Sequence, residues 1–204
     1  MHPAPLFRET RIDVLLDRIR AWPLGLIAVN GTSAPIVAHT PVLVQQVTRK
    51  LTSLRFHLSA NNPVTAHLES GAAAIIAFTG PDAYISPDWY GEVPDQVPTW
   101  NYLSVEAEGV VAPADAAAFL DDLSAEFEAR LLPKPPWTRA KMNPAAFERM
   151  LRGIRAFEMV PARFEGISKL SQNKPPEART GVIEALSATP GGLAIAQEMR
   201  KLDE

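Results

Sequence analysis

The hydrophobic positions of the chain predict strands over the first 111 residues, with helices between and after them. Apolar and polar residues alternate over 101–111, with Leu103, Val105, Ala107 and Val111 on one side. This period of two is typical of a strand that is buried on one face. The other predicted strands are shorter and cover 24–30, 34–39, 54–59, 72–79 and 83–86.

Helices are predicted where the apolar period lengthens and where capping residues stand at the start of a segment. Asn62-Pro63 and Asn143-Pro144 both place an asparagine cap before a proline, which is favoured at the first helical position. A strand over 157–169, interrupted near Pro161, is expected after the second of these helices. The predicted helices cover 9–21, 63–70, 115–131 and 143–152, followed by two short helices that Pro190-Gly191-Gly192 divides.

This order of elements predicts a mainly β, α+β fold: a small antiparallel barrel with helices around it. The early strands are joined like hairpins, whereas a doubly wound fold needs a helix after nearly every strand. We expect one domain over residues 1–187 and a helical tail over residues 188–204.

Composition restricts the classes of function. The chain has 204 residues, of which 47% are hydrophobic, and a net charge of −3, which argues against a protein held to DNA mainly by phosphate contacts. The absence of cysteine excludes disulfides and thiolate nucleophiles. No apolar run has the length of a membrane span, and the start of the chain lacks a signal-peptide pattern, so we expect a cytoplasmic protein. Motifs for a metal site, a P-loop, a Rossmann site or a serine nucleophile are missing, and no metal is expected.

Three groups of residues are candidates for binding chemistry. Five aromatic residues fall between 84 and 102, and they predict either packing on the core or a platform for a planar ligand. His39 and His57 stand near strand ends, where their side chains can project into the mouth of a barrel. The segment Lys169–Asn173 (KLSQN) offers a cation, a hydroxyl and two amides, which suit a polar ligand edge as well as a solvated loop.

A basic stretch over 134–155 leaves two interpretations open. Five arginines and lysines follow Lys134, and only Glu148 opposes them. The stretch is either a nucleic-acid patch or, more simply, a solvated helix face.

Several motifs together resemble the PaiB-type FMN-binding proteins, often called negative transcriptional regulators. The motifs are Ala38-His39-Thr40-Pro41, the segment from His57 to Asn62-Pro63, GPDAYISPDWY (80–90), VPTWNY (97–102) and KLSQN. The resemblance extends from the N-terminus to about residue 187. It implies an FMN-binding split barrel, shared with pyridoxamine-phosphate oxidases, that works as a homodimer with FMN between the subunits. Departures from the family pattern occur at Thr40, Phe56 and Val64-Thr65.

The candidate residues suit the parts of FMN. Ser59, Asn61 and Asn62 lie between a strand and a helix N-terminus, where hydroxyl, amide and backbone N–H groups can meet a phosphate. Trp100 and Tyr102 are expected to contact the flavin ring, and Asn101 to hydrogen-bond its edge. Lys169 is expected to supply positive charge to the phosphate or the reduced ring, with Ser171, Gln172 and Asn173 beside it. His39 and His57 complete the predicted cofactor site.

Three classes of function are compatible with these residues. The resemblance implies an FMN-binding transcriptional regulator, although no helix-turn-helix is evident and DNA contact has little support in the sequence. The alternatives are a flavin-dependent oxidoreductase that uses a reduced nicotinamide and a simple flavin carrier. Whether the protein is an enzyme is left open by the residues alone.

Overall fold

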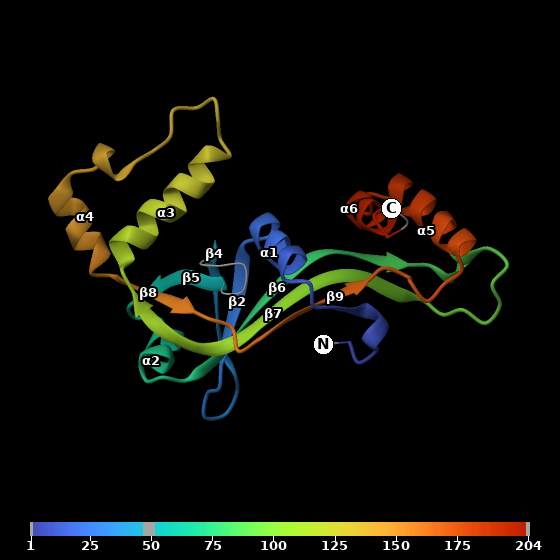
Figure 1. Cartoon of the computed structure of the whole chain (residues 1–204), viewed down its shortest axis with the longest axis horizontal. Coiled ribbons are helices and arrows are strands. Elements are labelled where there is room, and N and C mark those ends of the chain that lie inside the picture. Colours follow the sequence, from blue (N-terminus) through green and yellow to red (C-terminus); the bar gives the residue numbers. More distant parts are fainter. Residues whose placement is uncertain (1, 47–51, 203–204) are drawn as a thin grey trace. The chain divides into compact units, whose positions relative to one another are not determined.

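A computed structural model describes residues 2–46 and 52–202 (Figure 1). The chain forms two units. The first comprises residues 1–18, 79–105 and 165–204, and the second comprises residues 19–78 and 106–164. Helix α1 (Ile12–Ala21) and strands β6 (Ala73–Ile85) and β7 (Thr99–Ala114) each contribute residues to both units.

Short strands dominate the described chain, and they are accompanied by helices of moderate length. The remaining strands are β1 (Arg8–Glu9), β2 (Leu24–Val29), β3 (Ile36–Pro41), β4 (Leu43–Gln46), β5 (Thr52–Ser59), β8 (Ile154–Met159) and β9 (Arg163–Lys169). The remaining α-helices are α2 (Pro63–Glu69), α3 (Ala116–Ala129), α4 (Pro144–Leu151), α5 (Pro176–Ala188) and α6 (Leu193–Arg200). Three single-turn 3-10 helices are η1 (Pro5–Phe7), η2 (Pro87–Tyr90) and η3 (Arg139–Lys141).

Antiparallel pairing organises the second unit. Strand β2 lies between β3 and β6, so that Ile27 is opposite Ala38 on one side and Ile76 on the other. Strand β5 lies between β4 and β8, and the end of β7 continues the pairing along β8. The hairpin predicted for the first two strands is therefore confirmed, as is the antiparallel sheet.

Helix α3 covers β5 and β8 of the second unit. Asp115 caps it, because its carboxylate accepts hydrogen bonds from the N–H groups of Ala117 and Ala118. Phe119 is fully buried and packs in a cluster with Leu43 and Ala156. This buried face fixes α3 over the strand that carries His57.

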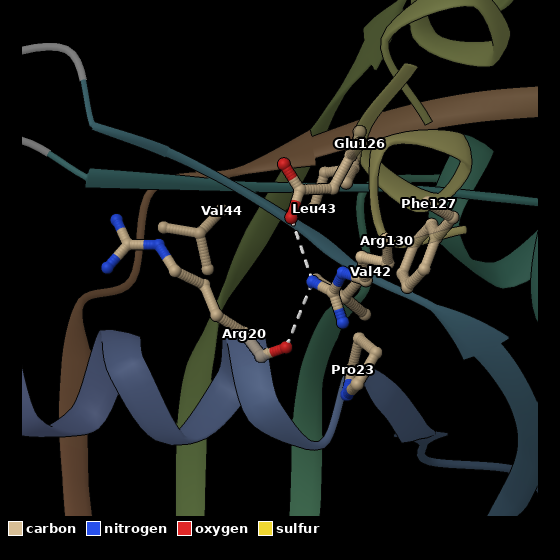
Figure 2. A pocket seen from close by; sticks show the side chains of 8 residues that line it. All are labelled: Arg20, Pro23, Val42, Leu43, Val44, Glu126, Phe127 and Arg130. Carbon is tan, nitrogen blue, oxygen red and sulfur yellow. Dashed lines mark hydrogen bonds and ion pairs between the residues drawn. The ribbon is translucent and has the colours of Figure 1, made fainter. Parts of the chain in front are cut away.

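Arg130, just after α3, closes a small cavity of about 40 Å³ against the end of α1 (Figure 2). Its Nη2 donates to the carbonyl of Arg20 at 3.1 Å and to Glu126 Oε1 at 2.8 Å. A cation at the carbonyl end of a helix is favourable, so this contact stabilises the last turn of α1.

In the first unit β1 pairs with β9. Gly166 of β9 has no room for a side chain, since a Cβ would lie 2.5 Å from the carbonyl oxygen of Ser104 and 2.7 Å from Leu15 Cδ2. The buried guanidinium of Arg18 donates to the carbonyl of Ile167 at 3.1 Å and to Ser168 Oγ at 2.7 Å. These contacts set the course of the chain that leads into KLSQN.

Helix α5 packs against α6 and η2 in the first unit, and Figure 1 shows the two helices side by side near the C-terminus. Val182, Leu186, Ile195 and Met199 form their buried side. The prediction of two short C-terminal helices is confirmed. The proposed division into a domain over 1–187 and a tail over 188–204 stays a prediction.

The structure corrects the sequence prediction at three places. The segments 72–79 and 83–86 belong to one continuous strand, β6. This strand continues through Pro81 because the pairing with β2 ends at Ala77, and beyond it a missing N–H donor costs little on that side. The strand β4 was not predicted. The strand expected over 157–169 is interrupted near Pro161, as predicted, and forms β8 and β9.

Helix α1 begins at Ile12 instead of near residue 9. Glu9 belongs to β1, and its carboxylate accepts hydrogen bonds from the N–H groups of Thr10 and Arg11. Burial raises the pKa of Glu9, but hydrogen bonds and charge from Arg11 outweigh it, so the pKa lies below its ordinary value. No helix in the described ranges combines the length and apolar character needed to cross a membrane.

Candidate functional site

A cavity of about 300 Å³ in the first unit brings the VPTWNY and KLSQN motifs together. Val97, Thr99 and Asn101 line it from the start of β7, and Lys169, Ser171 and Asn173 line it from the end of β9 and the turn beyond. The two segments are seventy residues apart in sequence. The remaining lining residues are His2, Phe7, Tyr90 and Lys174.

A buried hydrogen bond joins the two motifs. Asn101 is fully buried, and its Nδ2 donates to Ser171 Oγ at 3.0 Å and to Met199 Sδ at 3.5 Å. Asn101 occupies the inward face of β7 that Leu103 and Val105 continue. Its amide therefore positions the wall of the cavity, a role that the sequence analysis did not assign to it.

Two lysines place positive charge in the same cavity. Lys169 Nζ donates to Thr99 Oγ1 and, at 2.8 Å, to the carbonyl of Trp100. Lys174 donates to Gln96 Oε1 and lies over the ring of Tyr90, 4.9 Å from its centroid. Within the described residues, neither lysine forms an ion pair with a carboxylate.

No carboxylate in residues 2–46 and 52–202 compensates the charge of these lysines. Partial burial lowers the pKa of Lys169, and the charge of Lys174 lowers it further. A bound anion would oppose both effects, because it favours the protonated lysine. The cavity is thus suited to a negatively charged group.

The turn after β9 is held by its own side chains. Ser171 adopts a positive φ of 63°, an uncommon conformation for a residue other than glycine. Gln172 binds locally, since its Oε1 accepts from the N–H of Leu170 at 2.8 Å and its Nε2 donates to the carbonyl of Ser168. Gln172 does not line the cavity, so within the chain it shapes the KLSQN turn.

The predicted aromatic platform is exposed. Trp100 is 52% exposed and meets Tyr84 edge to face, with ring centroids 6.3 Å apart. Tyr102 is half-buried on the same side of β7 as Trp100, opposite to Asn101. Trp100 and Tyr102 therefore lie on the other face of the strand from the residues that line the cavity.

The remaining predicted residues lie in the second unit. Asn62 caps α2, and its Oδ1 accepts from the N–H of Val64 at 2.9 Å. Ser59 Oγ accepts weakly from the N–H of Asn61 at 3.4 Å, and the Ser59 carbonyl accepts from Thr65 Oγ1 at 2.8 Å. The backbone N–H of Val64, at the helix N-terminus where phosphate contact was predicted, is thus already paired.

The two strand histidines differ in their surroundings. His39 is exposed on β3. His57 lies on β5 and packs against Phe119, with ring centroids 5.5 Å apart. It lines a second cavity, of about 360 Å³, within the second unit. His39 does not line that cavity.

The sequence of the chain matches one protein-family model. Residues 1–163 match the family model described as "Putative FMN-binding domain". The chain belongs to this family. FMN is therefore the cofactor of the family, and the sequence-based recognition of an FMN-binding, PaiB-like protein is confirmed.

Relatives of this FMN-binding family cover nearly the whole chain. The Bacillus subtilis "Protease synthase and sporulation protein PAI 2" is 26% identical over 91% of this chain and 89% of its own length. An uncharacterized protein of Emericella nidulans is also 26% identical, covering 100% of this chain and 98% of its own length.

Solved structures confirm the predicted fold class. The FAD and heme binding protein from Mycobacterium smegmatis has a TM-score of 0.57 and 18% identity, covering 87% of this chain and 79% of that one. The flavocytochrome Anf3 from Azotobacter vinelandii has a TM-score of 0.57 and 14% identity, with 82% and 72% covered. The α+β, antiparallel split-barrel class predicted from the sequence thus holds for this member of the FMN-binding family.

The residues of the first-unit cavity fit a part of FMN. The two lysines, which have no carboxylate partner in the described part of the chain, suit its phosphate, and the hydroxyls and amides beside them suit ribityl hydroxyls. Six residues that line the cavity were not among the predicted site residues: His2, Phe7, Tyr90, Val97, Thr99 and Lys174. Lys174 follows KLSQN directly, and this adjacency was the signal that could have identified it.

Proposed function

We propose that this protein is an FMN-binding regulator of the PaiB type, and that the cavity of the first unit holds the phosphate of FMN. The supporting observation is the pair Lys169 and Lys174, which share one cavity with no carboxylate partner among the described residues. A phosphate supplies the missing negative charge, and charge-assisted hydrogen bonds to it are strong.

Each neighbouring residue has a defined task in this proposal. Lys169 neutralises the phosphate, while Thr99 and the Trp100 carbonyl hold the ammonium group at the cavity wall. Asn101 and Ser171 fix β7 and the KLSQN turn at one spacing. Asn173 offers its amide to the ribityl chain. When bound, FMN supplies electron-transfer chemistry that these residues lack.

The ring is assigned to the exposed aromatic residues and to a second copy of the chain. Trp100 is 52% exposed and Val97 is 72% exposed, so both are open to a partner. A homodimer with FMN between its subunits would cover them. Trp100 and Tyr102 lie on the face of β7 opposite to the cavity, so in this proposal they contact the ring of an FMN whose phosphate is held by the other copy. The assignment of Ser59, Asn61, Asn62, His39 and His57 to the cofactor site stays a prediction from the sequence, and the phosphate site proposed here does not depend on it.

A titration with FMN and riboflavin tests the cofactor site. Riboflavin lacks the phosphate, so we expect the protein to bind FMN at least about tenfold more tightly, the effect of about 1.4 kcal/mol. Quenching of flavin fluorescence measures both dissociation constants. Equal affinity for the two flavins would contradict the placement of the phosphate between the lysines.

The dimer has a separate test. An interface that covers the exposed residues of β7 and holds FMN should bury about 1,600 Å² or more. Sedimentation at micromolar concentration is expected to give a dimer. A monomer that still binds FMN would refute the shared site.

The regulatory role rests on the family likeness, and the relative's name refers to protease synthesis and sporulation. In the basic stretch, Arg139 pairs with Asp121 at 2.9 Å and Arg155 with Glu69 at 3.1 Å, which reduces the charge available to phosphates. We therefore expect this protein, which we expect to be cytoplasmic, to bind DNA weakly and to release it as the salt concentration rises. Binding of one DNA sequence that persists at physiological salt would show direct operator recognition instead.

A further inference from the structure

The second unit contains a cavity of about 360 Å³ that the flavin proposal does not use. Leu120, Asp121 and Ser124 line it from α3, and His57 lines it from β5. Apolar side chains of the segment from Trp137 to Ile154 form the remaining wall. This volume is within the range of small-molecule sites, roughly 300–1,000 Å³.

The imidazole of His57 is one of the polar groups that line this cavity. Its Nδ1 is buried without a hydrogen bond, and no other described residue bonds to the ring. Burial lowers the pKa of His57, so the ring is neutral near pH 7. A neutral imidazole can donate at one nitrogen and accept at the other. Among the described residues, the hydrogen-bonding capacity of this ring is therefore unused.

The charges at the cavity are already neutralised. Arg139 Nη2 forms an ion pair with Asp121 Oδ2 at 2.9 Å, and the same guanidinium lies over the ring of Phe147, 4.9 Å from its centroid. Both charged groups that line the cavity thus satisfy each other. An ion entering the cavity would find no uncompensated opposite charge, so an uncharged molecule fits better.

The wall opposite α3 is preformed but adaptable. The N–H of Trp137 donates to Glu128 Oε2 at 2.8 Å, and Lys141 Nζ donates to the carbonyl of Pro136 at 2.8 Å. These bonds hold the proline-rich segment in place. Met142 and Met150 also line the cavity, and their flexible thioether side chains adjust well to aromatic rings.

We propose that this cavity binds a small, uncharged aromatic molecule with one hydroxyl or N–H group, which hydrogen-bonds to the imidazole of His57. The aromatic body packs against Trp137, Phe147 and the two methionines. This inference is independent of the phosphate site, because no residue of the two-lysine cavity takes part in it.

A pair of probes that differ by one hydroxyl tests the proposal. Equilibrium dialysis of the full chain against 2-naphthol and against naphthalene measures the two affinities. We expect one saturable site per chain for 2-naphthol and about two- to twelvefold weaker binding of naphthalene, the usual contribution of one net hydrogen bond. In His57→Phe the ring volume remains but the hydrogen bond is lost, so the two affinities should become equal.

A filled cavity provides the second arm. Ser124→Phe places a ring in the cavity from α3 and should abolish binding of both probes, while Ala125→Phe adds the same ring on the exposed side of the helix and should leave binding unchanged. Circular dichroism shows whether each variant is folded, and His57→Phe remains decisive if Ser124→Phe unfolds. Three results would overturn the proposal: no saturable binding of 2-naphthol, an unchanged preference for the hydroxyl in His57→Phe, or displacement of 2-naphthol by FMN.

Discussion

Replacing Lys169 by methionine separates the role of its charge from that of its apolar stem. The ammonium donates to Thr99 Oγ1 and to the carbonyl of Trp100, and no carboxylate among the described residues balances it. Loss of a hydrogen bond to a charged group costs about 1.5–3 kcal/mol, which weakens binding about ten- to a hundredfold. Because Lys169 is only half-buried, solvent screens part of this effect, and we expect Lys169→Met to weaken FMN binding about tenfold.

The same substitution should not destabilise the free protein. Burial and the charge of Lys174 both disfavour the protonated Lys169, so the native fold gains nothing from this charge in the absence of an anion. We expect an equal or higher melting temperature for Lys169→Met without flavin. This combination, weaker binding without loss of stability, is typical of a residue kept for a ligand.

Fluorescence titration of FMN and riboflavin, together with thermal unfolding, measures both effects. Lys201→Met is the matched control, because Lys201 is exposed and pairs with Glu198 at 2.6 Å at the end of α6. An unchanged FMN affinity in Lys169→Met would remove the lysine from the site. An equal loss for riboflavin would mean that Lys169 faces the ring instead of the phosphate.

Three further predictions concern the fold around the two cavities. Gly166→Ala should strongly lower the denaturant concentration at the unfolding midpoint, because the new Cβ would lie 2.5 Å from the carbonyl oxygen of Ser104. A midpoint equal to that of the unmodified protein would show that β9 can shift. Asn101→Ala should lower the free energy of unfolding by about 1–3 kcal/mol, because it leaves the buried Ser171 hydroxyl without its partner. A smaller change in urea unfolding would mean that a water molecule replaces the amide. The pKa of His57 is lower in the folded protein than in the unfolded chain, so the unfolded chain takes up a proton first as the pH falls. The stability that the neutral ring contributes is therefore complete above pH 6.5. It is lost as the pH falls from there through the folded-state pKa. His57→Gln should flatten this part of the pH profile of unfolding, and an unchanged profile would assign the acid sensitivity to other groups.

The sequence predicted most of the fold because the local signals are strong. Asn62 and Asn143 cap helices as their positions predict, and the alternation along 101–111 marks the inward face of β7 correctly. The prediction failed where pairing overrides a local signal. Separate strands were predicted over 72–79 and 83–86, yet β6 continues through Pro81 because no β2 residue is paired there.

The candidate site was only partly predictable, for a related reason. Residue type indicated that Lys169 and Asn101 have side chains able to bind a polar ligand. Only the tertiary structure shows that the amide of Asn101 donates its hydrogen bond to Ser171 instead. The contributions of His2 and Phe7 to the cavity had no local signal at all, because they depend on where the N-terminal segment lies in the folded unit. Contacts between residues distant in sequence are what periodicity and capping rules cannot supply.

The sequence positions of the residues that line the two-lysine cavity determine when this cavity can form during translation. The residues that line it range in sequence from residue 2 to Lys174, and Thr99 precedes Lys174 by 75 residues. At a translation rate of about 5–20 residues per second, the ribosome needs about 4–15 s to make that intervening stretch. During this interval the nascent chain has β7 but no partner for Asn101. The flavin binding proposed for this cavity therefore has to follow the synthesis of nearly the whole chain.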